Sequence, residues 1–227
     1  LEQVAADFGD TRRSELGSAE EIVEYDPQAY IVKENTNVVV TKEGWIKRVG
    51  QMSSVAKTRV REGDAVLTVV PGSTLDSVVF FCNDGIAYTL PIHQLPISSA
   101  YSEPLAKRAK MKDGVSVVGA LTTDARFVPS LEEVGDEVGL TLLIATKAGQ
   151  VMRLPFEAFR SPSTKSGRKF CRRGKTDHVA YVELVRDAET MFMASRKARV
   201  LHFAIDDVPV LGNAGKGVRG IKLEAGD

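Results

Sequence analysis

The sequence predicts an all-β domain of repeated, propeller-like blades that follows a short helical or linker segment. One hairpin pattern recurs four times: an apolar run meets a short polar turn, and a second run leaves with basic and apolar residues alternating. The four copies occupy residues 38–48, 78–88, 142–153 and 191–201. Their turn residues Gly44, Gly85, Gly149 and, in a degenerate fourth copy, Ala198 are spaced by 41, 64 and 49 residues. Intervals of about 40–50 residues are typical of propeller blades with several strands each.

The chain before the first hairpin is predicted to be a short helix and a linker. Residues 2–24 carry apolar positions among Glu, Gln and Ala, and Asp26-Pro27 ends any helix, which places a boundary after residue 28. From residue 29 to 227 the runs are short and β-branched and are separated by Gly, Pro, Asn and Asp, as in an all-β domain. The blades are predicted at roughly 30–63, 64–112, 113–172 and 173–227.

Each hairpin is predicted from its turn and from the end of its second strand. Glycine accepts the positive φ that a tight turn imposes, so turns such as Asn83-Asp84-Gly85 join two strands. The later second strands run toward Pro91, Pro155 and Pro209, where a missing N–H ends a strand or leaves it at an edge. The longest interval is predicted to hold an inserted acidic loop, Asp124 to Glu137.

The charges are segregated although their formal sum is zero. The first 30 residues hold eight acidic residues against two arginines, whereas residues 147–175 hold nine basic residues against Glu157 alone. Segregated positive charge favours a polyanionic partner. No export signal is visible, and no apolar run reaches the ~18 residues that a membrane span needs. We therefore expect a cytoplasmic protein with no membrane partner.

The residues that usually carry chemistry are scattered. Cys82 and Cys171 lie far apart and are expected to be buried or incidental thiols in a reducing compartment. His93, His178 and His202 share no metal-ligand or catalytic spacing. No catalytic, metal or cofactor site is therefore predicted in this chain.

Two glycine-containing segments resemble nucleotide-binding motifs but do not meet their requirements. Residues 167–176 resemble a phosphate-binding loop but place six residues, rather than four, before Gly174-Lys175-Thr176. Residues 215–220 match a dinucleotide fingerprint literally, but residues 221–223 read as a strand where that fingerprint needs a helix. We expect a glycine-bearing segment that leads into a strand and carries two cations.

Basic residues recur at each hairpin or its outgoing loop. A circular arrangement would place them as a discontinuous positive track on a rim, which suits the phosphates of duplex DNA. The scarce aromatic residues lie in apolar strands, which argues against stacking of single-stranded bases. The alternative is that these cations are merely solvated. The candidate DNA-binding residues are Lys42, Lys47, Arg48, Lys57, Arg59, Arg61, Lys107, Arg108, Lys110, Lys112, Arg153, Lys165, Arg168, Lys169, Arg172, Arg173, Lys175, Arg196, Lys197, Arg199, Lys216 and Arg219.

The repeats resemble the C-terminal domain of the A-type subunits of bacterial type IIA topoisomerases, that is, of gyrase and topoisomerase IV. Residues 8–13 look like the segment that leaves the coiled-coil arm of the catalytic core, and residues 38–47 look like the first blade. Residues 86–96 look like the second blade, and residues 217–223 like the beginning of a later one. The resemblance covers nearly the whole chain.

The resemblance implies a β-pinwheel, a disc of about four to five four-stranded blades whose neighbours exchange strands. Its rim would bind and bend duplex DNA and present it for strand passage, without an active site in this chain. ATP and Mg²⁺ would serve the catalytic core and an ATPase B-type partner subunit of the ATP-hydrolysing enzyme, on the nucleoid.

One departure from the family pattern bears on wrapping. The A-type subunits of gyrase carry a Gln-Arg-Arg-Gly-Gly-type box after the first blade, but residues 50–59 lack it, and Arg172-Arg173-Gly174-Lys175 echoes it elsewhere. This favours a topoisomerase IV-like subunit, or a gyrase with a degenerate box, over gyrase-type chiral wrapping. A protein-interaction propeller and a small-molecule enzyme on a propeller are the remaining alternatives. The end at Asp227, where another blade would begin, suggests a truncated chain or a reduced disc.

Overall fold

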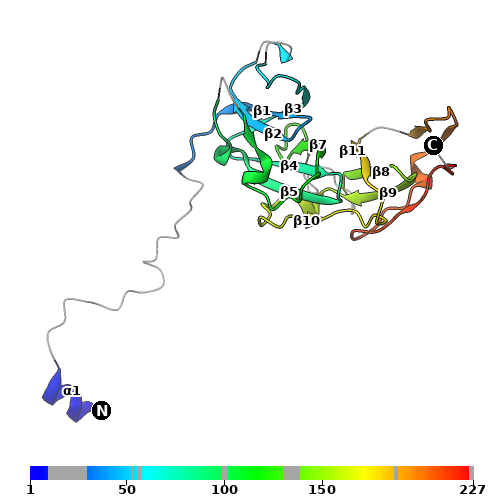
Figure 1. Cartoon of the computed structure of the whole chain (residues 1–227). Coiled ribbons are helices and arrows are strands. Elements are labelled where there is room, and N and C mark those ends of the chain that lie inside the picture. Colours follow the sequence, from blue (N-terminus) through cyan, green and yellow to red (C-terminus); the bar gives the residue numbers. More distant parts are fainter. Residues whose placement is uncertain are drawn as a thin grey trace. The chain divides into compact units, whose positions relative to one another are not determined.

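The computed structural model describes residues 1–9, 30–52, 54–55, 58–98, 102–129, 139–186 and 189–224. The chain divides into two compact units, residues 1–31 and 32–227. The first contains α1 (Glu2–Phe8), a single short helix with no buried residue, as the N-terminal pattern predicted. The rest of the predicted linker, residues 10–28, lies outside the described residues. The second unit holds every strand (Figure 1).

In the described part of the second unit the strands form three four-stranded antiparallel sheets and one two-stranded sheet. The first sheet has the order β3-β1-β2-β6, the second β7-β4-β5-β10 and the third β11-β8-β9-β14. The first sheet consists of β1 (Asn35–Thr41), β2 (Trp45–Val49), β3 (Val66–Ser73) and β6 (Glu103–Pro104). The second consists of β4 (Ser77–Cys82), β5 (Ile86–Pro91), β7 (Val117–Thr122) and β10 (Arg168–Lys169). The third consists of β8 (Thr141–Thr146), β9 (Gln150–Pro155), β11 (Val179–Val185) and β14 (Val218–Arg219).

The fourth strand of each sheet comes from beyond the next hairpin. After β5 the chain returns to the first sheet as β6, and after β9 it returns to the second sheet as β10. After the fourth hairpin, β12 (Thr190–Ala194) and β13 (Val200–Ala204), it returns to the third sheet as β14. The predicted exchange of strands between neighbouring blades is thus confirmed. Each predicted blade range contains one hairpin, but each four-stranded sheet also includes strands from the next predicted range.

The four predicted hairpins are all present. Gly44, Gly85 and Gly149 take φ values of +80°, +85° and +79° in their turns, and Ala198 takes +58° in the fourth. Ala198 is the only residue other than glycine with a positive φ in the part of the chain that the structure describes. The fourth turn therefore adopts the same left-handed geometry with a less suitable residue.

The carbonyl oxygen of each of the first three turn glycines holds the exchanged segment. The N–H of Leu105 donates to Gly44 O at 2.9 Å, that of Phe170 to Gly85 O at 2.9 Å, and that of Gly220 to Gly149 O at 2.9 Å. A Cβ on Gly85 would lie 2.4 Å from the carbonyl oxygen of Cys171. The turn glycine therefore permits both the turn and the close approach of the next segment.

Apolar cores lie between successive sheets. One combines the first two hairpins around Val38, Ile46 and Phe80, and another combines the second and third around Phe81, Leu142 and Phe170. The rings of Phe81 and Phe170 meet edge to face, with centroids 5.2 Å apart. Phe170 is fully buried, so the exchanged segment contributes directly to the core.

Short 3₁₀ turns follow the exchanged or outgoing strands. They are η4 (Ile92–Gln94), η5 (Leu105–Lys107), η6 (Glu157–Phe159) and η7 (Ile205–Asp207). Strands β5 and β9 end at prolines, as predicted. Residues 221–223 were predicted to be a strand, which is wrong. The strand there is β14 (Val218–Arg219), which ends two residues before Ile221, because its N–H and C=O groups pair with β9. Part of the predicted acidic insert, residues 130–137, lies outside the described residues.

Candidate nucleic-acid interface

Strands β6, β10 and β14 form one edge of their sheets, opposite the edge formed by β3, β7 and β11. Residues of β3, β7 and β11 line one shared pocket of about 400 Å³, so these strands lie on the inner side. The edge formed by β6, β10, β14 and their flanking loops is named the outer edge here. The outer edge carries many of the predicted cations.

Neighbouring segments of the outer edge contact one another. The N–H of Lys110 donates to Lys165 O at 2.7 Å, which joins the segments that carry β6 and β10. The N–H of Arg172 donates to Gly215 O at 2.8 Å, which joins those that carry β10 and β14. Cations from three sheets therefore belong to one continuous series of backbone segments.

Exposed cations without an internal side-chain partner recur along the outer edge. Each is an exposed residue with no hydrogen bond or ion pair from its side chain to any other described part of the chain. From the predicted set these residues are Lys110, Lys112, Lys165, Lys169, Arg172, Lys175, Lys216 and Arg219. Their charges are available to an external anion.

Two predicted arginines of the same segments are held internally instead. The guanidinium of Arg168 donates to the carbonyl oxygens of Ala158, Ser161 and Pro162 at 2.9, 2.7 and 3.2 Å. Arg173 donates to Asp84 O at 3.1 Å and to Asp177 O at 2.8 Å. These side chains fix the loops that carry the exposed cations, so the proposed interface excludes them.

Two predicted cations of the first hairpin are buried. Lys47 is 1% exposed and its Nζ donates to Arg59 O at 2.8 Å. Burial, and then the charge of Arg59, lowers the pKa of Lys47. Arg48 is 8% exposed. Both lie in the middle of β2. If the two faces of β2 alternated between buried and exposed, only one of these two side chains would be buried.

Other predicted cations are bound to neighbours or lie away from the outer edge. Arg153 donates to Val208 O at 2.9 Å, and the guanidinium of Arg61 stacks 3.5 Å above the ring of Trp45. Lys107 and Arg108 both pair with Glu103, and Arg199 pairs with Glu224. Lys42, Arg59, Arg196 and Lys197 are exposed on the first and fourth hairpins and the loop after the first. Lys57 lies outside the described residues.

Lys222, an exposed cation three residues after Arg219, was not among the predicted DNA-binding residues. It follows Ile221, which is 8% exposed. A basic residue directly after an apolar position of the exchanged segment is the sequence pattern that could have identified it. With Lys222, the third exchanged segment carries three exposed cations.

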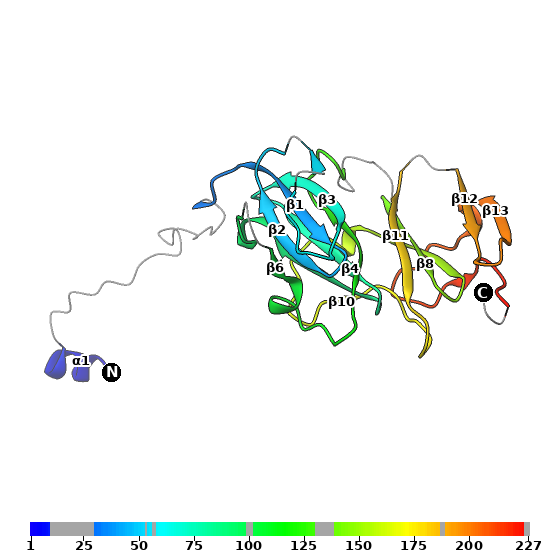
Figure 2. The ribbon, with the colours of Figure 1, turned by 45° about the horizontal axis from the view of Figure 1, so that its top comes forward.

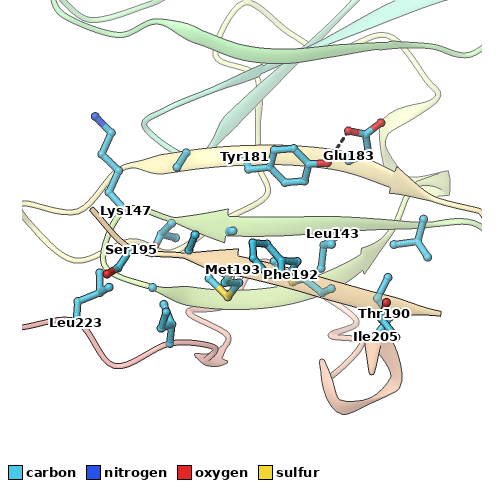
Figure 3. A pocket seen from close by; sticks show the side chains of 18 of the residues that line it. Leu143, Lys147, Tyr181, Glu183, Thr190, Phe192, Met193, Ser195, Ile205 and Leu223 are labelled. Carbon is cyan, nitrogen blue, oxygen red and sulfur yellow. Dashed lines mark hydrogen bonds between the residues drawn. The ribbon is translucent and has the colours of Figure 1, made fainter. Parts of the chain in front are cut away.

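A mainly apolar pocket lies between the third sheet and the fourth hairpin. The strands β12 and β13 of that hairpin lie beside β11 and β8 (Figure 2). The pocket measures about 590 Å³ and is bounded by β8, β11 and β12, with Leu143, Phe192 and Met193 among the residues that line it (Figure 3). Tyr181 and Glu183 both line this pocket, and the Tyr181 hydroxyl donates a hydrogen bond to the Glu183 carboxylate at 2.6 Å. Burial and this carboxylate raise the pKa of Tyr181 to about 12. The Tyr181 hydroxyl therefore stays protonated at neutral pH.

Both cysteines lie in the interior of the second unit. Cys82 and Cys171 are buried and free, and burial raises the pKa of Cys82 to about 12 and that of Cys171 to about 11. Over the described ranges no three His, Cys, Asp or Glu residues gather in a way that would hold a metal ion. None of the helices in that part of the chain is long and apolar enough to cross a membrane.

A family described as "DNA gyrase C-terminal domain, beta-propeller" matches residues 76–124, 141–186 and 189–227, more than half of the chain. The chain belongs to this family. Among its relatives, the A subunit of DNA gyrase from Dehalogenimonas lykanthroporepellens is 28% identical over 100% of the chain and 28% of the relative. The A subunit of DNA topoisomerase 4 from Caulobacter vibrioides is 24% identical over 96% of the chain and 26% of the relative. The chain thus spans about a quarter of the length of these relatives.

Solved structures show the same fold. The crystal structure of the C-terminal domain of DNA topoisomerase IV matches 86% of this gyrase-family chain with a TM-score of 0.72 and 21% identity, over 59% of its own length. The E. coli ParC C-terminal domain matches 85% with a TM-score of 0.68 and 22% identity, over 73% of its length. The predicted β-pinwheel fold and the resemblance are therefore confirmed.

Proposed function

We propose that this domain binds duplex DNA along the outer edge. The observation that carries the proposal is that each exchanged segment brings exposed, unpaired cations to the same edge of its sheet. Spaced cations on a curved series of segments match spaced phosphates, and contacts of this kind are largely independent of base sequence.

Bending of the bound duplex for strand passage is the second part of the proposal. The domain would act within a larger type IIA topoisomerase on the nucleoid, whose catalytic core and ATPase B-type subunit use ATP and Mg²⁺. The relatives include both gyrase and topoisomerase 4 A subunits, so the distinction between bending and chiral wrapping depends on residues 50–59, which lack the Gln-Arg-Arg-Gly-Gly-type box. That departure favours bending without strong wrapping.

The test is a titration of a labelled duplex of about 30 base pairs with the domain, monitored by fluorescence anisotropy and repeated at salt concentrations from about 50 to 200 mM. If about five to eight of the outer-edge cations meet phosphates, log K should fall with log[salt] with a slope of about −4.5 to −7. A binding constant that does not change with salt would contradict the proposal.

A further inference from the structure

A polar pocket opens on the outer edge between the first two exchanged segments. It measures about 510 Å³, and its lining includes Glu103, Lys107 and Arg108 from one segment and Ser163 and Lys165 from the other. The two segments are joined beside it, because the N–H of Lys110 donates to Lys165 O at 2.7 Å. Three cations therefore face one concave site that is large enough for a phosphate group.

One carboxylate in the pocket pairs with two of these cations. Glu103 accepts a hydrogen bond from Lys107 Nζ at 3.1 Å and another from Arg108 Nε. The Glu103 side chain is only 17% exposed, whereas that of Lys107 is 70% exposed. Burial opposes ionisation, but the hydrogen bonds from Arg108 and Lys107 lower the pKa of Glu103, so it is charged at neutral pH.

The acidic residue departs from the repeat. In β6, β10 and β14 the residues that pair with the second position after the turn glycine are Glu103, Arg168 and Val218. Glu103 is the only acidic residue in these three exchanged strands. The first segment therefore carries, at a position where the side chain is only 17% exposed, a charge that opposes an anionic ligand of the edge.

We propose that the pocket receives one backbone phosphate of DNA and that Glu103 is a built-in competitor for it. The inference rests on the function proposed above. A phosphate that enters takes the hydrogen bonds of Lys107 and Arg108 that Glu103 holds in its absence, while Lys165 contacts it from the facing segment. The carboxylate thereby weakens binding at this junction and reduces the number of counterions that DNA releases.

The test is Glu103→Gln in the full chain, titrated with the same duplex at several salt concentrations. Glutamine keeps the size of the side chain and its carbonyl acceptor but removes the charge. Removal of one negative charge about 6 Å from a phosphate is expected to tighten binding about threefold at low salt. The salt slope should become steeper by about 0.9, because one more cation is freed for DNA.

Glu183→Gln is the matched control. It makes the same change of charge on β11, at the opposite edge of the third sheet, and its carbonyl can still accept from the Tyr181 hydroxyl. Tighter binding by Glu103→Gln alone supports the inference. Unchanged or weaker binding by a folded Glu103→Gln, or an equal gain from Glu183→Gln, overturns it. If the unaltered chain does not bind DNA at all, the proposed function itself fails.

Discussion

Substitution of Gly85 by alanine should detach the exchanged segment from the second sheet. The φ of +85° at this position is strained for any residue with a Cβ, and the added carbon would lie 2.4 Å from Cys171 O. The carbonyl of Gly85 also accepts the N–H of Phe170 at 2.9 Å and that of Cys171 at 3.2 Å. The backbone must therefore move away at the point where it delivers Phe170 to the core.

The cost of the substitution is the sum of three effects. The left-handed conformation costs about 1–2 kcal/mol, and two lost hydrogen bonds add about 1 kcal/mol each. Partial exposure of Phe170, which is fully buried, adds roughly 1–2 kcal/mol. We expect Gly85→Ala to lower the free energy of unfolding by about 4–6 kcal/mol, a value at the high end for one substitution.

Gly44→Ala is the matched control for the turn itself. Gly44 has nearly the same φ, +80°, but a Cβ there would meet nothing within 4 Å. Gly44→Ala should therefore lower the free energy of unfolding only by the cost of the left-handed conformation, about 1–2 kcal/mol. Both variants are compared by urea denaturation followed by far-UV circular dichroism. Equal losses of stability would refute the argument that the turn glycine holds the exchanged segment.

Three further outcomes follow from single positions. Ala198→Gly should raise the free energy of unfolding by about 0.5–1 kcal/mol, because relief at φ +58° exceeds the entropy added to the unfolded chain; a lower melting temperature would count against it. Arg168→Ala should lower the free energy of unfolding by about 1–3 kcal/mol, because charged hydrogen bonds are lost. Lys169→Ala should lower it by less than about 0.5 kcal/mol but should weaken DNA binding. If thermal melts rank the two variants in the opposite order, these roles are wrong. Cys82, with its pKa raised to about 12, should resist iodoacetamide in mildly alkaline buffer until the chain unfolds; labelling at the same rate in folded and urea-unfolded protein would show that reasoning to be wrong.

The hairpins were predictable because their signals are local. A glycine turn between two apolar runs, as at Asn83-Asp84-Gly85, defines the pairing of β4 with β5 within residues 77–91. The partners of the outer strands were not predictable from pattern alone. Strands β6, β10 and β14 are two residues long and lie in polar loops, so they show no alternation. Their positions depend on turn carbonyls more than 60 residues away in sequence, such as Gly44 O for Leu105.

The candidate site was predictable in composition but not in detail. Arg168 and Lys169 are adjacent and carry the same charge, yet the first binds three carbonyl oxygens of a neighbouring loop and the second is exposed. Lys47 looked like a surface cation and is instead 1% exposed, because β2 is covered on both faces. Charge in a sequence says how many cations are available, but only the packing of loops says which are free.

The central claim is that free cations of the outer edge, rather than positive charge in general, bind DNA. The most direct measurement compares Lys165→Ala/Lys169→Ala with Lys33→Ala/Lys147→Ala, two variants of equal charge change at exposed residues. The first pair should reduce the slope of log K against log[salt] by about 1.8 and weaken binding, since each phosphate contact contributes about 0.9. The second pair should leave the slope within about 0.5 of the unaltered chain, because neither residue lies on an exchanged segment. Equal changes for the two pairs would contradict the account.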